Sequence, residues 1–262
     1  MPSAWSMDVT RSVPTLLPEW TPSQIPTRSW FSTPSDNPCD SRRPTPTITP
    51  GSPVIRVLAV AVLPSSRDIY TGHRNYELPT PSVPGNAALG RIVAVGTDAT
   101  KLQPGNLIFV DAVVRSRDDP TAAALSGISG GHSAASKRLI GTEGRDSTYV
   151  EYARVPLENS LSWMRSDCWA RSSNGGLGYD LNGLLYRGVQ LVLFGGLRAV
   201  GVGRGGDRVI ISPATGSFGG AAVQIALAMG ASVIAMGRNG EVLERLRSFF
   251  APRYGKDRIQ TV

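Results

Sequence analysis

Residues 207–239 constrain the fold more than any other stretch of the chain. They read as a short apolar strand that ends at Ile211, a glycine-rich turn, a helix-forming run over 221–229 and a second apolar strand. The turn packs three glycines into five positions, at 216, 219 and 220. Strands that alternate with a helix in this way are typical of a βαβ unit, so the sequence predicts an α/β domain built on a parallel sheet.

The turn has the spacing A-x-G-x-x-G, with Ala214 where the commoner fingerprint has glycine. Such a turn lets the backbone approach a pyrophosphate closely and points a helix N-terminus at it. The match alone carries little weight, but the strand before it and the helix and strand after it are the context that the motif requires. A tight strand–helix turn in an unrelated α/β protein is the alternative. The predicted dinucleotide-binding residues of the turn are Ala214, Thr215, Gly216, Ser217, Phe218, Gly219 and Gly220.

The end of the second strand bears on the choice of cofactor. NAD-binding units commonly place Asp or Glu about 20 residues after the glycine turn, where it bonds the ribose 2′-hydroxyl. This chain has Gly237-Arg238-Asn239 instead. Gly237 removes the repulsion that a carboxylate would exert on a 2′-phosphate, and Arg238 offers a planar cation suited to phosphate. The sequence therefore predicts NADP(H) as the cofactor, with a solvated loop position for Arg238 as the alternative.

The composition argues against several classes of function. The chain has 262 residues, of which 41% are hydrophobic, and a formal net charge of +7. Its Lys and Arg residues are scattered rather than interleaved with aromatic residues, which argues against nucleic-acid binding. No apolar run approaches the ~18 residues that span a membrane. Cys39 and Cys168 lie far apart and form no disulfide or metal pattern, so we expect a cytoplasmic protein in a reducing compartment.

Residues 1–53 differ from the rest of the chain. They hold 11 of its 20 prolines, together with many Ser and Thr residues. Proline at this density disfavours both helices and sheets, so we expect a disordered tail. A mitochondrial transit peptide is the alternative. The arginines of this segment favour it, and the acidic residues oppose it.

The middle of the chain is rich in short β-like runs. Apolar or alternating segments are bounded by Pro and Gly and separated by polar, glycine-rich loops. This pattern predicts a compact β-barrel-like domain. A helix is expected at 178–194, where leucines recur. The expected strands lie at 54–63, 90–96, 107–110 and 149–153.

Taken in order, these phrases resemble a known family. VRVLAV, SSRDIYTGH, PGNAALGRIVAVGTDATKLQPGNLIFV and TYVEYARVP precede the A-x-G-x-x-G turn. In this combination the chain resembles the medium-chain dehydrogenase/reductase family over residues 54–262, and it looks closest to zinc-independent fungal members that are similar to alcohol dehydrogenases or quinone reductases. The resemblance implies a β-rich GroES-like barrel domain at 54–170, followed by a partial α/β Rossmann domain with a doubly wound parallel sheet at 171–262.

The resemblance also implies a function. Hydride transfer with NADP(H) is expected to reduce a carbonyl, quinone or enone, or to oxidise an alcohol. The implied partner is a small-molecule substrate, with no nucleic acid and no membrane. For a full-length chain the resemblance leaves a homodimer open.

Zinc is the point at which the chain departs from much of this family. Zinc-dependent members carry a cysteine where this chain has Ser65, and a Gly-His-Glu phrase where it has Gly85-Asn86-Ala87. Hydroxyl and amide oxygens are poor replacements for thiolate and imidazole around Zn²⁺. The four-cysteine loop that holds structural zinc in the family has no counterpart here. We therefore predict no metal site.

Without a metal, hydrogen bonds must polarise a carbonyl substrate. The candidates near the corresponding pocket of the family are Asp68, Tyr70 and His73. Tyr70 is the predicted catalytic residue, because its hydroxyl can give a proton to a developing enolate or alkoxide. The alternative is a structural Tyr70, with its ring packed into the barrel and its hydroxyl on a backbone carbonyl. The alternative for His73 is a surface loop position.

The C-terminal residues indicate how many strands of a nucleotide-binding domain the sequence contains. A doubly wound nucleotide domain needs about six strands. Here a second helix at 241–250 is followed by residues 257–262, which read as the start of a third strand. The sequence therefore predicts a partial Rossmann domain. A truncated, catalytically inactive paralogue with residual or no nucleotide binding is the alternative function.

A serine hydrolase is a rival from another class of enzyme. Residues 127–131 read Gly-Ile-Ser-Gly-Gly and satisfy G-x-S-x-G, with Ser129 as the nucleophile. That motif needs a preceding strand, a following helix and a later histidine. The segment before it is alanine-rich, and no histidine follows His132. The sequence therefore gives the hydrolase little support.

Overall fold

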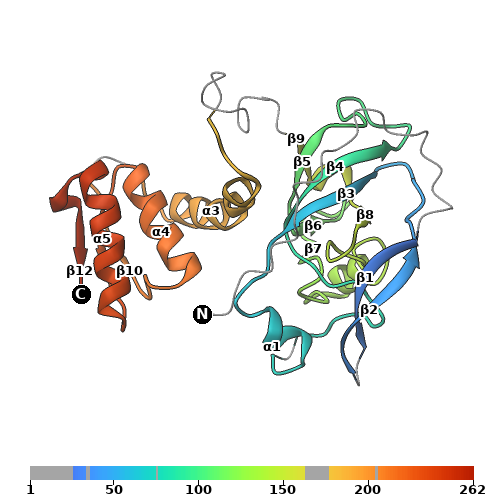
Figure 1. Cartoon of the computed structure of the whole chain (residues 1–262), viewed down its shortest axis with the longest axis horizontal. Coiled ribbons are helices and arrows are strands. Elements are labelled where there is room, and N and C mark those ends of the chain that lie inside the picture. The colour runs from blue at the N-terminus through green and yellow to red at the C-terminus, as the bar shows by residue number, and fades with distance from the viewer. Residues whose placement is uncertain (1–25, 34–35, 75, 163–176, 204–205) are drawn as a thin grey trace. The chain divides into compact units, whose positions relative to one another are not determined.

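The structure, a computed structural model, describes residues 26–33, 36–74, 76–162, 177–203 and 206–262 (Figure 1). Internal contacts divide the chain into two compact units, Met1–Leu185 and Tyr186–Val262. The elements of the N-terminal unit are β1 (Pro26–Thr33), β2 (Asp36–Pro44), β3 (Pro53–Val60), α1 (Ser66–Tyr70), β4 (Ala88–Val95), β5 (Leu107–Val110), β6 (Val113–Arg115), β7 (Ala123–Leu125), α2 (Ala134–Gly141), β8 (Tyr152–Arg154), the 3-10 helix η1 (Leu157–Asn159) and β9 (Ser160–Ser162). Helix α3 (Leu181–Ala199) begins in this unit and ends in the next. The C-terminal unit continues with β10 (Arg208–Ile211), α4 (Ser217–Ala228), β11 (Ser232–Ala235), α5 (Gly240–Tyr254), the 3-10 helix η4 (Lys256–Arg258) and β12 (Ile259–Thr261).

Strands β1 and β2 form an antiparallel hairpin in which Pro26 lies opposite Pro44. The hairpin falls within the segment for which we expected a disordered tail, so the structure differs from that expectation over 26–44. Proline is tolerated here because both strands of a two-stranded ribbon are edge strands, which can do without some ladder bonds. Residues 1–25 lie outside the described residues.

A five-stranded antiparallel sheet forms the centre of the N-terminal unit, in the order β8-β3-β4-β5-β9. Strand β5 is buried on both faces. Ile108 and Val110 belong to one apolar cluster, whereas Leu107 and Phe109 belong to another. This two-sided burial explains why the strand reads as an unbroken apolar run rather than an alternating one.

The first turn of α3 completes the core of this unit. Asp180 precedes the helix, and its Oδ1 accepts a hydrogen bond from Gly183 N at 2.7 Å, which explains where the helix begins. One turn in, Leu184 is fully buried in the cluster that includes Phe109. The helix expected at 178–194 is therefore present, with its end displaced to Ala199.

The sequence pattern does not predict the two short helices of the N-terminal unit, α1 and α2. Helix α2 lies in a region that reads as a polar, glycine-rich loop. It begins after Ser133, whose Oγ accepts a hydrogen bond from Ser136 N at 3.0 Å, and it buries Ile140. The N-cap serine is the available signal, but a helix of eight residues is too short for its apolar periodicity to reveal it.

The C-terminal unit is a parallel βαβαβ arrangement, as the sequence predicts. Strands β10, β11 and β12 pair in that order, with α4 between the first two and α5 between the last two. Both connections move in the same direction across the sheet, and right-handed crossovers then place both helices on one face. The buried core between sheet and helices includes Val233, Ala235 and Ile259.

The third strand expected at 257–262 is present as β12, immediately after the 3-10 turn η4. Burial within the three-stranded sheet is uneven. Ile210 in β10 is 64% exposed, while Ile211 beside it is 8% exposed and belongs to the core. Within the described residues, one face of the sheet is therefore buried more fully than the other.

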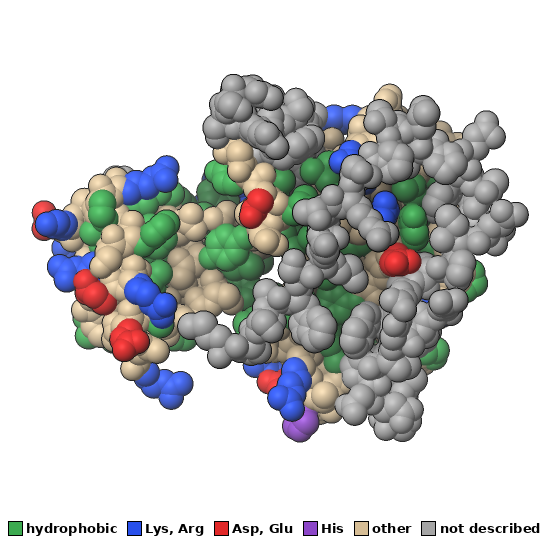
Figure 2. Space-filling view, viewed as in Figure 1, with side chains coloured by type: hydrophobic (Ala, Val, Ile, Leu, Met, Phe, Trp, Pro, Cys, Tyr) green, Lys and Arg blue, Asp and Glu red, His purple; other side chains and the backbone are tan. Residues whose placement is uncertain are grey.

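No helix in the described ranges combines the length and the apolar character needed to cross a bilayer. Among the described side chains drawn in Figure 2, Lys and Arg lie interspersed with acidic and apolar groups. A small-molecule partner without nucleic acid remains a prediction at this point.

Candidate cofactor-binding site

The glycine turn lies between β10 and α4, at the carboxyl end of the parallel strands. Two backbone bonds hold it there: Ala214 N donates to Met236 O at 2.7 Å, and Met236 N donates to Ile211 O at 2.9 Å. The Ala214 side chain is fully buried in the core of the unit, so only its backbone is available to a ligand. Ligands of open α/β sheets bind outside the carboxyl ends of the strands, which is where this turn lies.

Gly219 brings helix α4 directly against the turn. A Cβ built on this glycine would overlap Pro213 O and would lie 2.9 Å from Ala214 Cα. Both obstacles belong to the backbone, which cannot move aside as a flexible side chain can. Gly219 therefore serves the close packing of helix on strand, which is the role that the last glycine of this motif requires.

Gly216 has a different environment. It is the N-cap of α4 and offers no side-chain cap. The first intrahelical bond runs from Gly220 N to Gly216 O at 2.8 Å, so the N–H groups of residues 217–219 have no acceptor within the helix. A Cβ at Gly216 would meet no protein atom within 4 Å. Bare backbone and open donors at a helix N-terminus fit an anion such as a pyrophosphate.

The end of β11 lies beside the turn. Gly237 N donates to Val262 O at 3.2 Å, which fixes the backbone just beyond the strand. A Cβ on Gly237 would lie 2.6 Å from Cγ2 of Thr215. Arg238 follows, with an exposed side chain that makes no ion pair with any described residue. The fold thus brings Thr215 of the turn to the strand end that carries Gly237 and Arg238.

Asn239 has a structural task at this place. Its Oδ1 accepts a hydrogen bond from Val242 N at 3.1 Å and caps helix α5. An N-cap position favours Asn for this reason, so the residue type is explained without a ligand. Contact between Asn239 and a cofactor stays a prediction.

Tyr70 lies in the N-terminal unit, at the end of α1. Its hydroxyl oxygen is 2.9 Å from Gly127 O and 3.2 Å from both O and N of Gly85. The single phenol proton points to these two carbonyls, of which Gly127 O is the nearer, and the phenol oxygen accepts from Gly85 N, so the main chain engages both the proton and the oxygen. The ring packs edge-on against Tyr149, with 6.0 Å between ring centroids.

Burial raises the pKa of Tyr70 well above its usual range, and the neighbouring Tyr149 raises it further. A general acid works best with a pKa near the working pH. The raised pKa and the main-chain bonds favour the structural alternative for Tyr70, and its catalytic role stays a prediction.

The variant Tyr70→Phe distinguishes these two roles. Without the hydroxyl, Gly127 O and Gly85 N lose a buried partner, so we expect the free energy of unfolding to fall by about 1–3 kcal/mol. Tyr76→Phe is the matched control, because Tyr76 is an exposed tyrosine. Chemical denaturation measures the effect. An unchanged stability together with lost turnover would assign Tyr70 to catalysis instead.

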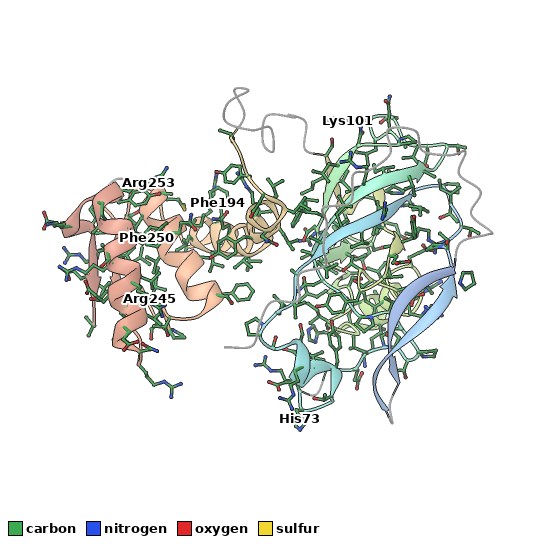
Figure 3. All side chains as sticks on the ribbon, in the orientation of Figure 1. His73, Lys101, Phe194, Arg245, Phe250 and Arg253 are labelled. Carbon is green, nitrogen blue, oxygen red and sulfur yellow. The ribbon has the colours of Figure 1, made fainter. Side chains whose placement is uncertain are left out.

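Asp68 and His73 lie on the surface around α1, and both side chains are exposed. His73 Nδ1 is 2.7 Å from Thr71 Oγ1. Figure 3 labels His73 at the outer tip of this segment. The histidine therefore occupies the surface loop position that was its alternative.

Comparison with known proteins identifies the N-terminal domain. Residues 49–164 match the family described as the alcohol dehydrogenase GroES-like domain. This part of the chain is therefore similar to the alcohol dehydrogenase GroES-like domain. The expected order, a GroES-like domain followed by a partial α/β Rossmann domain, is confirmed.

Solved structures share this fold. A thermostable alcohol dehydrogenase from Pyrobaculum aerophilum with bound cobalt and zinc is 23% identical at a TM-score of 0.66, with 90% of this chain and 66% of that chain covered. An alcohol dehydrogenase superfamily protein from Novosphingobium aromaticivorans is 20% identical at 0.64, with 90% and 58% covered. CAD from Helicobacter pylori, complexed with NADP(H), is 18% identical at 0.65, with 90% and 64% covered. The chain thus spans 58% to 66% of the length of these three structures. A comparison with curated proteins gives no match.

Two positions at which zinc-dependent members are expected to carry ligands lie in the GroES-like domain, and here they are Ser65 and Asn86, which offer oxygen donors. Asn86 is 8% exposed, and its Oδ1 accepts a hydrogen bond from Ala87 N at 2.7 Å. Ser65 is the residue that precedes α1. The Ser65 hydroxyl and the Asn86 amide oxygen do not fit the ligand preferences of zinc, and the amide oxygen is already bonded to Ala87 N. In the part of the chain that the structure describes, no three His, Cys, Asp or Glu side chains gather as a metal site would require.

Packing in the GroES-like domain explains the G-x-S-x-G match. Ser129 is buried, and its Oγ accepts a hydrogen bond from Gly131 N at 3.2 Å. A Cβ on Gly130 would overlap Glu77 O, and Gly127 has a φ of 71°. These glycines allow a positive φ and close main-chain approaches. No hydrogen bond joins Ser129 to a histidine within the described ranges.

Sequence reasoning missed a cavity of about 320 Å³ in the same domain. Arg43, Arg145 and Arg154 contribute to its lining. Asp146 pairs with Arg43 at 3.2 Å and with Arg145 at 3.1 Å, and Glu143 pairs with Arg154 at 3.3 Å. The cavity draws on segments that are distant in the sequence, so no local pattern could have revealed it.

Proposed function

We propose that the chain is a cytoplasmic, zinc-independent oxidoreductase of the medium-chain dehydrogenase/reductase family that binds NADP(H). Its substrate is a small carbonyl, quinone or enone that is reduced, or an alcohol that is oxidised. One observation carries this proposal. The open N-terminus of α4, with bare backbone at Gly216, lies next to a strand end that offers Arg238 and no acidic residue at Gly237.

Each part of the site has a distinct role in this proposal. The N–H groups of residues 217–219 bind the pyrophosphate, because they point out of the helix without an acceptor. Arg238 binds the 2′-phosphate with a charge-assisted contact. The exposed side chains of Ser217 and Phe218 border the same end of the helix. When bound, the nicotinamide supplies the hydride, and the protein positions it.

The choice of NADP(H) over NAD(H) rests on local residues rather than on relatives. One structural neighbour is complexed with NADP(H) and another with NADH, so the shared fold does not decide between the two. An acid at the end of the second strand would accept from a ribose 2′-hydroxyl and repel a phosphate. This chain has Gly237 there, and the Arg238 guanidinium makes no ion pair with a described carboxylate.

Titration of the purified protein with NADPH and NADH tests the proposal, with the change in fluorescence of the reduced nicotinamide on binding as the readout. We expect saturable binding of NADPH, and oxidation of NADPH in the presence of quinones or enones. Elemental analysis of the same sample is expected to give far less than one zinc per chain, because the donor set does not fit the metal. A sample that binds neither nucleotide contradicts the proposal, and about one zinc per chain contradicts its metal-independent part.

A nucleotide-binding protein without turnover is the second candidate. The engaged hydroxyl of Tyr70 favours it, because the proton donor predicted from the sequence already bonds Gly127 O and Gly85 O. Saturable NADPH binding with no oxidation of NADPH on any carbonyl, quinone or enone tried would support this candidate. Turnover would reject it.

A further inference from the structure

The side chain of Thr215 occupies the space in front of Gly237. A Cβ on Gly237 would lie 2.6 Å from Thr215 Cγ2, 3.3 Å from its Oγ1 and 3.5 Å from its Cβ. Cβ atoms in real side chains do not approach another atom to 2.6 Å, so a side chain at position 237 would require the Thr215 methyl group to move from the place that it occupies here. The other two distances are tight or normal contacts.

The hydroxyl of Thr215 is available to a ligand. Thr215 is half-buried, and its Oγ1 makes no hydrogen bond with any described residue. The hydroxyl lies on the same side of the turn as the strand end that carries Arg238, because Thr215 contacts Gly237 directly. A half-buried hydroxyl without a partner commonly bonds water or a ligand.

We propose that Thr215 is a specificity-determining residue for the cofactor. Its hydroxyl donates to the 2′-phosphate of NADP(H), and its methyl group excludes an acidic side chain at position 237. This inference rests on the proposed function, because it assumes that the dinucleotide binds at the glycine turn. Selectivity then depends on Thr215 and Gly237 together with Arg238, which supplies the cation.

Two variants of Thr215 separate the hydroxyl from the methyl group. Thr215→Val keeps the shape and removes the hydroxyl, so NADPH affinity is expected to fall about ten-fold. Affinity for NADH, which has no 2′-phosphate, stays within about two-fold. Thr215→Ser keeps the hydroxyl and is expected to retain NADPH affinity. If Thr215→Val binds NADPH as tightly as the unmodified protein, the inference is wrong while the proposed function stands.

Position 237 provides the second test. Gly237→Asp is expected to lower the melting temperature, because the new Cβ meets the Thr215 methyl group at 2.6 Å. Adding Thr215→Ala removes that methyl group and leaves a normal contact, so the double variant should regain the lost stability and prefer NADH. Double-mutant analysis measures the coupling. Additive effects on melting temperature overturn the steric part of the inference. An unmodified protein that binds neither nucleotide contradicts the proposed function, and this inference with it.

Discussion

Replacing Gly219 by valine is expected to destabilise the C-terminal unit severely and to abolish nucleotide binding with it. The new Cβ would overlap Pro213 O and lie 2.9 Å from Ala214 Cα, so helix α4 must move away from the turn. Overpacking of this kind costs up to about 3 kcal/mol where side chains can adjust, and backbone atoms adjust less readily. We therefore expect the free energy of unfolding to fall by at least about 3 kcal/mol.

Gly216→Ala is the matched control for this prediction. Gly216 has φ −92° and ψ 170°, which any residue adopts, and a Cβ there meets no protein atom within 4 Å. Alanine at this N-cap should cost no more than about 1 kcal/mol. Its methyl group stands where a pyrophosphate would approach, so NADPH affinity should fall while the fold persists. Variants at the two glycines of one motif are thus expected to lose different properties, stability at Gly219 and NADPH affinity at Gly216.

Thermal melts followed by far-ultraviolet circular dichroism, together with NADPH titrations, measure both variants. A Gly219→Val protein that melts like the unmodified one would show that α4 does not need the close approach to Pro213. A Gly216→Ala protein with unchanged NADPH affinity would show that the turn serves the fold alone. Both measurements can be interpreted without knowledge of the substrate.

The α/β unit could be predicted because its signals are local. The apolar strand, the glycine turn and the helix-forming run follow one another without interruption, and each carries its own pattern. The helix boundary was less accurate. The sequence predicts the helix over 221–229, whereas α4 already begins at Ser217. Glycines read as turn residues, but Gly219 and Gly220 lie within the helix. At Gly219 close packing, not helix propensity, selects the glycine.

The contacts that decide what the residues do could not be predicted from local patterns. Tyr70 reads as a proton donor, but its hydroxyl bonds Gly85 and Gly127, which are 15 and 57 residues away. Thr215 reads as one position of a nucleotide turn, but its contact with Gly237 depends on how β11 ends. Such contacts form only when the tertiary fold brings distant segments together, and the local sequence of neither segment indicates which residue the other will contribute.

Removing the guanidinium of Arg238 is expected to erase most of the preference for NADPH over NADH. A charge-assisted contact with the 2′-phosphate contributes about 1.5–3 kcal/mol, which corresponds to a preference of roughly ten- to a hundred-fold. Arg238→Ala should lose this increment for NADPH and leave NADH affinity nearly unchanged. Paired binding curves for the two nucleotides measure the effect directly.

Arg253→Ala is the matched control for Arg238→Ala, because it removes the same charge from the opposite end of α5 (Figure 3). It should leave the ratio of the two affinities unchanged, which separates a local contact from the influence of net charge. Salt gives a second check. Arg238 is exposed, so its contribution should shrink as the ionic strength rises from about 0.05 to about 0.5 M. If the unmodified protein binds NADPH and NADH equally well at low salt, Arg238 is a solvated loop residue, and the absence of an acid at position 237 reflects the space that Thr215 occupies rather than a choice of cofactor.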